Sequence, residues 1–333
     1  MKDTTRKLTR LLVTATGFAA AILATPAQAT EGGASLYLLG SGGPGVAEMP
    51  PLEGVYLDTI IYVYNGEAKA DRQFVVGGNV VAGLDATIAA QFASVLWVPS
   101  TDFLGGTLAV GALGAYGAPM VEVNAVITGP MGNEVSISRR DSDIIIGDPV
   151  VTAALGWKVG ENTHIQASTL VNIPIGQYRE NQLANLSFHR WIVDGSLAVT
   201  WKDEASGWDL SSKAGVTFNG NNDFTDYDSG NEFHWEASVG KSFSKSFSGA
   251  VQGYWLKQIS GDSGEGARLG PFKGEVFGIG ASAAWNTVLG RSPATIRGRF
   301  MKEFDATNRL EGESYWLELT LPLYMKMPPG AGG

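Results

Sequence analysis

Residues 190–202 read R-W-I-V-D-G-S-L-A-V-T-W-K and decide the fold class. Every second residue from Trp191 to Trp201 is apolar or glycine, whereas the alternate residues from Arg190 to Lys202 are mostly polar. A period of two predicts a β-strand with one apolar and one polar face. The two tryptophans are ten residues apart. At about 3.3 Å per residue and a tilt near 40°, this spacing climbs roughly 25 Å, the height of the apolar band of a membrane barrel.

Aromatic residues recur at both ends of the apolar faces of later strands, eight or ten residues apart. A soluble β-sandwich has no reason to place rings at both ends of its core face, whereas the two interfaces of a bilayer favour them. We therefore expect two membrane girdles, made of Trp191, Trp201, Trp208, Phe218, Phe233, Phe243, Phe247, Trp255, Phe277 and Trp285.

Composition agrees with an exported β-protein. The 333 residues include 44 Gly, only 17% are charged, and no cysteine is present. The lack of cysteine excludes disulfides, thiolate nucleophiles and cysteine-bound metals. A net charge of −9 without a basic patch makes nucleic acid an unlikely partner. No motif predicts a cofactor or a metal site.

The first 29 residues have the pattern of a secretory signal peptide, in which a basic start precedes an apolar run at 11–24 and an A-x-A site ends at Ala29. The run is shorter than the ~20 residues that a membrane anchor needs. We expect cleavage after Ala29. Because cleavage removes four basic and one acidic residue from a chain of net charge −9, the mature protein would carry −12.

Period-two segments predict twelve strands, at 54–64, 80–98, 104–127, 147–158, 163–174, 190–202, 207–219, 231–243, 247–259, 273–288, 294–305 and 314–325. The links after even strands, such as 99–103 and 289–293, are short. Those after odd strands, the eleventh included, are longer. This alternation is typical of an outer-membrane barrel. We predict an all-β, transmembrane, antiparallel up-and-down β-barrel over 54–325, with both termini periplasmic and a tail at 326–333. The segment 104–127 is long enough to hold two strands or a bulge at 114–119.

The polar faces of these strands would line a narrow lumen. The inward candidates are Asp194, Lys213, His234, Glu236, Tyr254, Arg297, Arg299 and Glu303, accompanied by Asp209, Gln252 and Glu318. Two interpretations of the Arg297/Arg299 pair stay open, a constriction that orients a solute and a salt-bridge network that stiffens the barrel. Rings with polar tips suit a path for apolar solutes, and the candidates are Tyr56, Tyr62, Tyr64, Tyr254 and Trp316. Tyr62 and Trp316 are expected to face each other where the first and last strands meet.

Three other features leave alternatives open. The Gly/Pro-rich segment at 30–53 is either periplasmic or a plug within the lumen. The Asn/Asp-rich stretch 219–231 has oxygen ligands for Ca²⁺ but lacks the EF-hand spacing, which favours an exposed loop. A membrane hydrolase would need His234 beside a nucleophile, but Ser238 on the same face is about 13 Å away along the strand. We expect no enzyme.

Seven stretches resemble the outer-membrane transporters of the MetA-pathway of phenol degradation family, also called SphA-like. They are T-E-G-G-A-S-L-Y at 30–37, F-L-G-G at 103–106, G-D-P-V-V-T-A-A-L-G-W at 147–157, I-P-I-G-Q-Y at 173–178, the Asn-rich segment 219–234, G-Y-W-L-K-Q at 253–258 and the Gly-Pro pair at 270–271. The resemblance implies a porin-type barrel in the outer membrane that takes up aromatic or hydrophobic compounds.

The expected partners are the lipid bilayer, lipopolysaccharide and a small solute. The oligomeric state stays open. A structural or surface-binding barrel is the main alternative function.

Overall fold

The structure is a computed structural model that describes residues 31–68, 73–76, 79–128, 134–142, 144–179 and 184–327. The predicted signal peptide and the last six residues lie outside this part of the chain. Among the described residues, no helix is long and apolar enough to cross a membrane.

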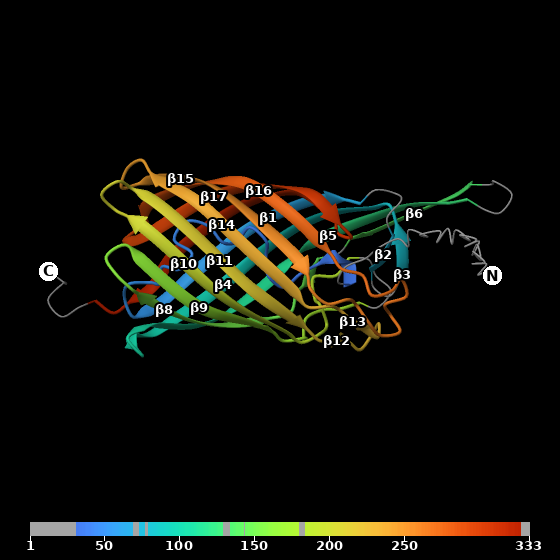
Figure 1. Cartoon of the computed structure of the whole chain (residues 1–333), viewed down its shortest axis with the longest axis horizontal. Coiled ribbons are helices and arrows are strands. Elements are labelled where there is room, and N and C mark those ends of the chain that lie inside the picture. Colours follow the sequence, from blue (N-terminus) through green and yellow to red (C-terminus); the bar gives the residue numbers. More distant parts are fainter. Residues whose placement is uncertain are drawn as a thin grey trace, which may run out of the picture.

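Twelve strands form a closed antiparallel barrel (Figure 1). In chain order they are β1 (Gly54–Glu67), β4 (Leu84–Phe103), β5 (Gly106–Thr128), β8 (Val150–Lys158), β9 (Thr163–Asn172), β10 (Ile192–Asp203), β11 (Trp208–Asn219), β14 (Glu232–Ser242), β15 (Phe247–Gln258), β16 (Glu275–Leu289), β17 (Ser292–Thr307) and β18 (Glu311–Met325). Each pairs with its neighbours, and β1 closes the barrel by pairing with both β4 and β18. The predicted all-β, closed antiparallel barrel is confirmed.

The remaining elements lie in the links and the N-terminal segment. They are the 3-10 helix η1 (Glu31–Gly33) and the strands β2 (Gln73–Val76), β3 (Asn79–Ala82), β6 (Glu134–Ser142), β7 (Ile145–Ile146), β12 (Asn221–Asn222) and β13 (Tyr227–Asp228). β6 and β7 pair with the C-terminal half of β5, and β2 pairs with β3.

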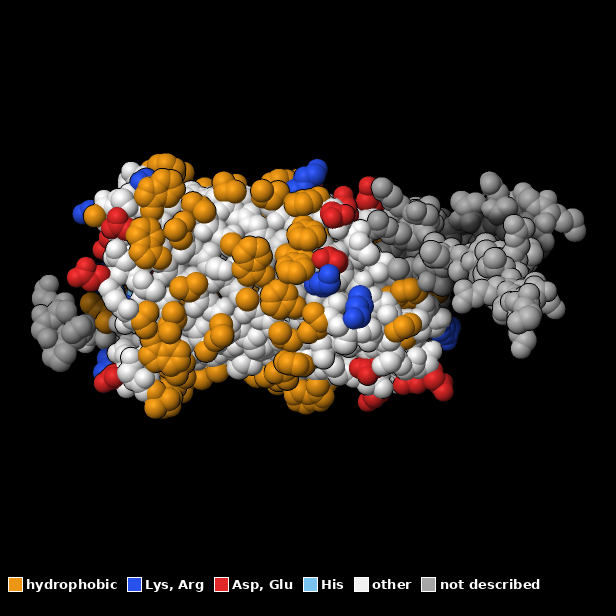
Figure 2. Space-filling model, in the orientation of Figure 1, with side chains coloured by type: hydrophobic (Ala, Val, Ile, Leu, Met, Phe, Trp, Pro, Cys, Tyr) orange, Lys and Arg blue, Asp and Glu red, His pale blue; other side chains and the backbone are white. Residues whose placement is uncertain are grey.

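The period of two in the sequence becomes an alternation between lumen and bilayer. Along β10, buried and exposed residues alternate, from Asp194, which is 1% exposed, to Leu197, which is 69% exposed. A closed barrel requires this arrangement, because successive side chains of a strand point to opposite sides of the sheet. Hydrophobic side chains gather in bands on the visible outer face, and charged side chains lie toward its ends (Figure 2).

The aromatic residues predicted as girdles face outward at two levels. At one level, Phe233, Trp255, Phe277 and Phe304 form a row of contacting rings across four neighbouring strands, with centroids 5.7 to 6.0 Å apart. At the other level, Phe243 stacks on Phe247, whose register partner is Trp285. Trp97, Phe304 and Tyr315 are also exposed on the outside, although the sequence analysis did not include them.

Tight turns connect the strands at one end of the barrel, here called the short-turn end. Two predicted boundaries are wrong there. β4 continues to Phe103, where residues 99–103 had been expected to form a turn, and only Leu104 and Gly105 separate it from β5. Both of these residues have positive φ, as a two-residue hairpin turn requires. The segment 104–127 holds one strand, since β5 is continuous from Gly106 to Thr128.

The opposite end, here called the long-loop end, carries most of the extended links. The predicted strand at 80–98 begins too early, because β3 ends at Ala82 and β4 begins at Leu84. The predicted long link after the eleventh strand is also wrong. β17 and β18 extend until only residues 308–310 separate them, and Asn308 has a φ of 56° at this turn.

Residues 31–53 run through the barrel from the long-loop end to the short-turn end (blue in Figure 1). Near its start Glu31 accepts a hydrogen bond from Asn222, midway Gly40 donates to Glu236, and near its end Glu48 pairs with Lys202. We call this stretch the lumen segment. The first described residue therefore lies at the end of the barrel opposite Met325, the last residue of β18. This arrangement of the described ends differs from the prediction, which placed both termini on the periplasmic side.

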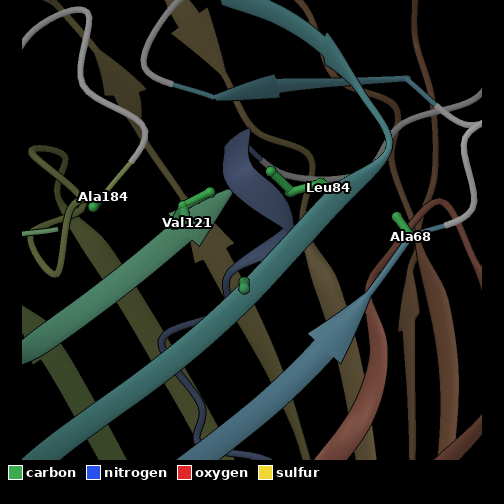
Figure 3. Packing of buried hydrophobic residues seen from close by; sticks show 5 residues of the cluster. Ala68, Leu84, Val121 and Ala184 are labelled. Atoms are coloured by element: carbon green, nitrogen blue, oxygen red, sulfur yellow. The ribbon is translucent and has the colours of Figure 1, made fainter. Parts of the chain in front are cut away.

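Buried apolar residues form small clusters inside the barrel, and one of them includes the lumen segment. Figure 3 shows one at the long-loop end, where Leu84, Ala86 and Val121 meet Ala68 and Ala184. A second cluster joins Leu39 of the lumen segment to β15, β16 and β17 through Leu256, Val276 and Met301. The lumen segment is thus packed against the wall as well as hydrogen-bonded to it.

Candidate functional site

A buried group of charged and polar side chains lies on the inner face of β10, β11 and β14, toward the long-loop end. His234 Nε2 is 2.8 Å from Asp194 Oδ2, and Asp194 also accepts hydrogen bonds from Ser196 and Thr217. The ring of Tyr37, from the lumen segment, stacks on His234 with centroids 3.6 Å apart. The histidine is therefore enclosed on one ring face and held in place at one nitrogen.

A second group surrounds Arg299. Glu318 pairs with both Arg297, at 3.1 Å, and Arg299, at 3.5 Å. The guanidinium of Arg299 lies 4.8 Å from the ring centroid of Trp316 and donates a hydrogen bond to the Gly40 carbonyl. The arginines therefore form the ion pairs that the salt-bridge interpretation expects, and Arg299 also holds the lumen segment. A constriction that orients a solute stays a prediction.

A third group is centred on Glu303, whose carboxylate accepts hydrogen bonds from Tyr64 at 2.7 Å and from Tyr254 at 3.0 Å. The backbone N–H of Gly312 donates to the same carboxylate. These contacts connect β1, β15 and β18 to β17 along one part of the inner wall.

All ten predicted path residues lie on the inner face, and the three groups bring most of them together. Glu236 belongs with the first group, because Lys213 is its cross-strand partner and Gly40 donates to its carboxylate at 2.6 Å. Tyr62 belongs with the second, through Trp316. Tyr56 is separate, since it donates to the Leu52 carbonyl near the short-turn end.

The lumen segment depends on glycine where it touches these groups. Gly40 has a φ of 87° and exposes both its N–H and its carbonyl to side chains of the wall. A Cβ at Gly42 would collide with the carboxylate of Glu236. Glycine allows both the left-handed conformation and the close approach. The position of this segment could not be predicted from the sequence, because its contacts lie about 120 to 270 residues away in the chain.

A cavity of about 530 Å³ lies beside the lumen segment. One side is apolar and comes from β1, β4 and β5, with Ile60, Phe92, Leu113 and Val121 among its residues. The opposite side is polar and includes Lys213 and Arg299. The volume is in the range of sites for small organic molecules, about 300–1,000 Å³.

A second hollow of about 480 Å³ lies at the short-turn end, between residues 47–51 and the start of β5 with β8 and β9. Between the two spaces, the inner faces of β5 and β8 carry small residues. Register pairs Ala109 with Ala154 and Gly111 with Thr152 in this strip. We call these four residues the small-residue strip.

Asp148 anchors the link 173–191 at the long-loop end and was missed in the sequence analysis. Its buried carboxylate accepts hydrogen bonds from Asn172, Ser187 and the backbone N–H groups of Gly176, Phe188 and His189. The G-D-P motif at 147–149 was the available signal. The same link carries Tyr178 and His189, which pack with Phe224 into an aromatic cluster.

The Asn/Asp-rich stretch 219–231 is held by hydrogen bonds to protein side chains, and Asp262 accepts two of them. Asp262 accepts hydrogen bonds from Tyr227, Gln258 and the Gly230 N–H. Burial raises the pKa of the Asp262 carboxyl, against the lowering effect of these hydrogen bonds. Burial, followed by the charge of Asp262, raises the pKa of Tyr227. Within the described ranges, no group of His, Asp and Glu side chains is arranged to hold a metal ion.

Comparison with known proteins gives a family assignment. The family model described as "Putative MetA-pathway of phenol degradation" matches residues 70–319, which is about three quarters of the chain. The chain belongs to this family. The resemblance inferred from the seven stretches is therefore confirmed. A search of curated proteins found no match.

Solved structures with a similar fold are outer-membrane barrels. The COG4313 outer membrane channel from Pseudomonas putida F1 is 15% identical, with a TM-score of 0.63 over 83% of this chain and 98% of that one. The translocator domain of the autotransporter NalP from Neisseria meningitidis is 10% identical, with a TM-score of 0.44 over 84% and 91%. A Pseudomonas aeruginosa FadL homologue is 10% identical, with a TM-score of 0.42 over 90% and 99%. The first of these shows the same fold, and with the apolar outer band it identifies this family member as an outer-membrane barrel.

Proposed function

We propose that this family member is a channel through which small hydrophobic or aromatic solutes cross the outer membrane. The observation that carries the proposal is the cavity of about 530 Å³, whose apolar side lies within an otherwise polar lumen. A channel for ions and hydrophilic solutes needs no such wall, whereas an apolar solute gains from every apolar contact that removes it from water. The family description, which names phenol degradation, supports an aromatic solute.

The long loops would face the outside, in contact with lipopolysaccharide, and the short turns the periplasm, as in other bacterial barrels. Solute would arrive past the aromatic cluster of Tyr178, His189 and Phe224. It would rest in the cavity and leave along the small-residue strip toward the hollow at the short-turn end. Residues 47–51, which line that hollow, would have to shift for the solute to pass. Export by a signal peptide cleaved after Ala29 remains part of the proposal.

Two other functions are tested by the same experiments. A structural barrel would neither conduct nor transport. A membrane hydrolase would depend on His234, but one face of this ring is covered by Tyr37 and its Nε2 lies against Asp194, which argues against access for a lipid ester.

The decisive experiment compares a deletion strain with the same strain carrying the gene, using uptake of radiolabelled toluene together with planar-bilayer conductance of the purified protein. We expect uptake to depend on the protein and conductance to be small, because the lumen segment occupies the barrel. Equal uptake by both strains, together with no conductance, would contradict the channel proposal and favour a structural barrel. Lipid release that depends on His234 would identify a hydrolase.

A further inference from the structure

One cation in the cavity wall has neither a hydrogen-bond acceptor nor an ion-pair partner among the described residues. Lys213 points inward from β11 between Ala198 and Glu236, its cross-strand neighbours, and it lines the cavity. Its ammonium lies 4.9 Å from the centroid of the Tyr37 ring. Within the described residues, this ammonium makes no hydrogen bond and no ion pair.

The other charged residues of the same cavity have partners. Arg299 pairs with Glu318, Arg309 with Glu232 and Arg190 with Glu31. The remaining acidic groups accept hydrogen bonds, Asp58 from Thr320, Glu303 from two tyrosines and Asp148 from the link 173–191. Lys213 therefore differs from its neighbours, since its three N–H donors are turned to the cavity without an acceptor.

The two acidic groups nearest to Lys213 do not pair with it. Both oxygens of Asp194 are engaged by Ser196, Thr217 and His234. In Glu236, Oε1 accepts a hydrogen bond from Gly40, whereas Oε2 has no hydrogen-bond partner and forms no ion pair with Lys213 among the described residues. An ammonium so placed is a ready donor for an acceptor group brought by a ligand, and a charged acceptor gives the stronger hydrogen bond.

We propose that the cavity selects apolar molecules that end in a carboxylate, with the carboxylate bound by Lys213. The apolar body of such a molecule would lie against Phe92, Leu113 and Val121 on the opposite side. This inference rests on the proposed function and narrows its solute class from hydrophobic compounds in general to aryl or alkyl carboxylates. A neutral hydrocarbon would fill the same space but leave the ammonium unpaired, at a cost in binding.

The test uses two probes that share a carbon skeleton, 4-phenylbutyrate and 4-phenylbutan-1-ol. Full-length mature protein is placed in lipid nanodiscs, and binding is measured by equilibrium dialysis at pH 8, with empty nanodiscs as the blank. We expect the carboxylate to bind about tenfold more tightly than the alcohol, as a charge-assisted hydrogen bond allows. Lys213→Met should remove this preference by lowering carboxylate affinity much more than alcohol affinity, because the hydrogen bond to a charged acceptor is the stronger one. Lys213→Arg should retain most of the preference. Gel shifts on heating verify that each variant is folded.

The outcomes separate the inference from the proposed function. Equal affinity of the wild-type protein for both probes would overturn the inference and leave the channel proposal standing. A carboxylate preference that survives in folded Lys213→Met would also overturn it. The lysine would then only balance the charge of Glu236 and pack against Tyr37 of the lumen segment. Binding of neither probe would count against the channel proposal itself. If Lys213→Met does not fold, Lys213→Gln takes its place, and the wild-type comparison remains decisive alone.

Discussion

Tyr62 and Trp316 are partners across the seam at which the last strand closes the barrel against the first. Their ring centroids are 4.9 Å apart and the rings are nearly perpendicular, at 83°. Phe92 contacts Tyr62 edge-on at 5.9 Å, and Arg299 lies over Trp316. Edge-to-face pairs add about 0.5–1.5 kcal/mol beyond the burial of their area. The seam is thus held by the backbone hydrogen bonds between β1 and β18 and by a row of inward-facing side chains. In this row Phe92 contacts Tyr62, Tyr62 contacts Trp316, and Trp316 contacts Arg299.

Replacing both rings, Tyr62→Ala with Trp316→Ala, should slow uptake of aromatic solutes and leave ion conductance equal or raised, because the lumen loses aromatic surface and gains space. Uptake of radiolabelled toluene and single-channel conductance are the measurements. The matched control is Val63→Ala with Leu317→Ala, the outward neighbours on the same strands. Unchanged aromatic uptake in a folded double variant would mean that the rings only pack the seam.

The cost in stability of an arginine on the outer face should depend on how deep its position lies in the bilayer. Leu197→Arg and Val193→Arg place a charge within the apolar band and should cost roughly 2–4 kcal/mol at its centre, falling toward the interface. Trp191→Arg, at a predicted girdle position, should cost about 0–1 kcal/mol. The free energy of unfolding of each variant is measured by urea titration of the protein in lipid vesicles. Equal costs at the three positions would contradict the predicted membrane placement.

The lumen segment should loosen when Gly42 acquires a side chain. In Gly42→Ala the added Cβ meets the Glu236 carboxylate, so the segment has to move away from the wall. We expect higher single-channel conductance than in the wild-type protein. Gly298→Ala is the control, because no atom lies within 4 Å of a Cβ at that position. A conductance identical to that of the control would show that the segment does not restrict the lumen.

Removing the carboxylate in Asp148→Ala should release the link 173–191, since several buried donors lose their acceptor at about 1–3 kcal/mol each. The barrel should still assemble, because the link lies outside the ladder. Trypsin cleavage after Arg179, an exposed residue of this link, should become markedly faster. Asp148→Asn keeps one acceptor oxygen, so we expect its cleavage rate to lie between those of the wild-type protein and Asp148→Ala. Cleavage at the wild-type rate would refute the anchoring role.

Strands could be predicted because apolar and polar residues alternate along them, and burial follows this period of two most clearly in β10. Asp194 and Leu197 fall on opposite faces in the sequence pattern and in the structure. Boundaries were less predictable where residues typical of turns occur inside strands. The stretch around Pro99 and Ser100 indicated a turn, whereas β4 continues through two register irregularities there.

The contents of the lumen were harder to predict. Inward positions such as His234 and Arg299 follow from the alternation alone. Their partners do not, because Tyr37 and Gly40 belong to a glycine-rich segment without periodicity, and its contacts span most of the chain. The aromatic pair at the seam was predictable only because closure makes the first and last strands neighbours.

The central claim is that solute passes through the lumen along the small-residue strip. Ala154→Phe places a ring in this strip, and Ala153→Phe places the same ring on the outer face of β8 one residue away. The measurement is the initial rate of radiolabelled toluene uptake by the deletion strain expressing each folded variant at equal levels. The account predicts that Ala154→Phe falls to the rate of the deletion strain while Ala153→Phe matches the wild-type rate. Equal, wild-type rates for both variants would contradict it.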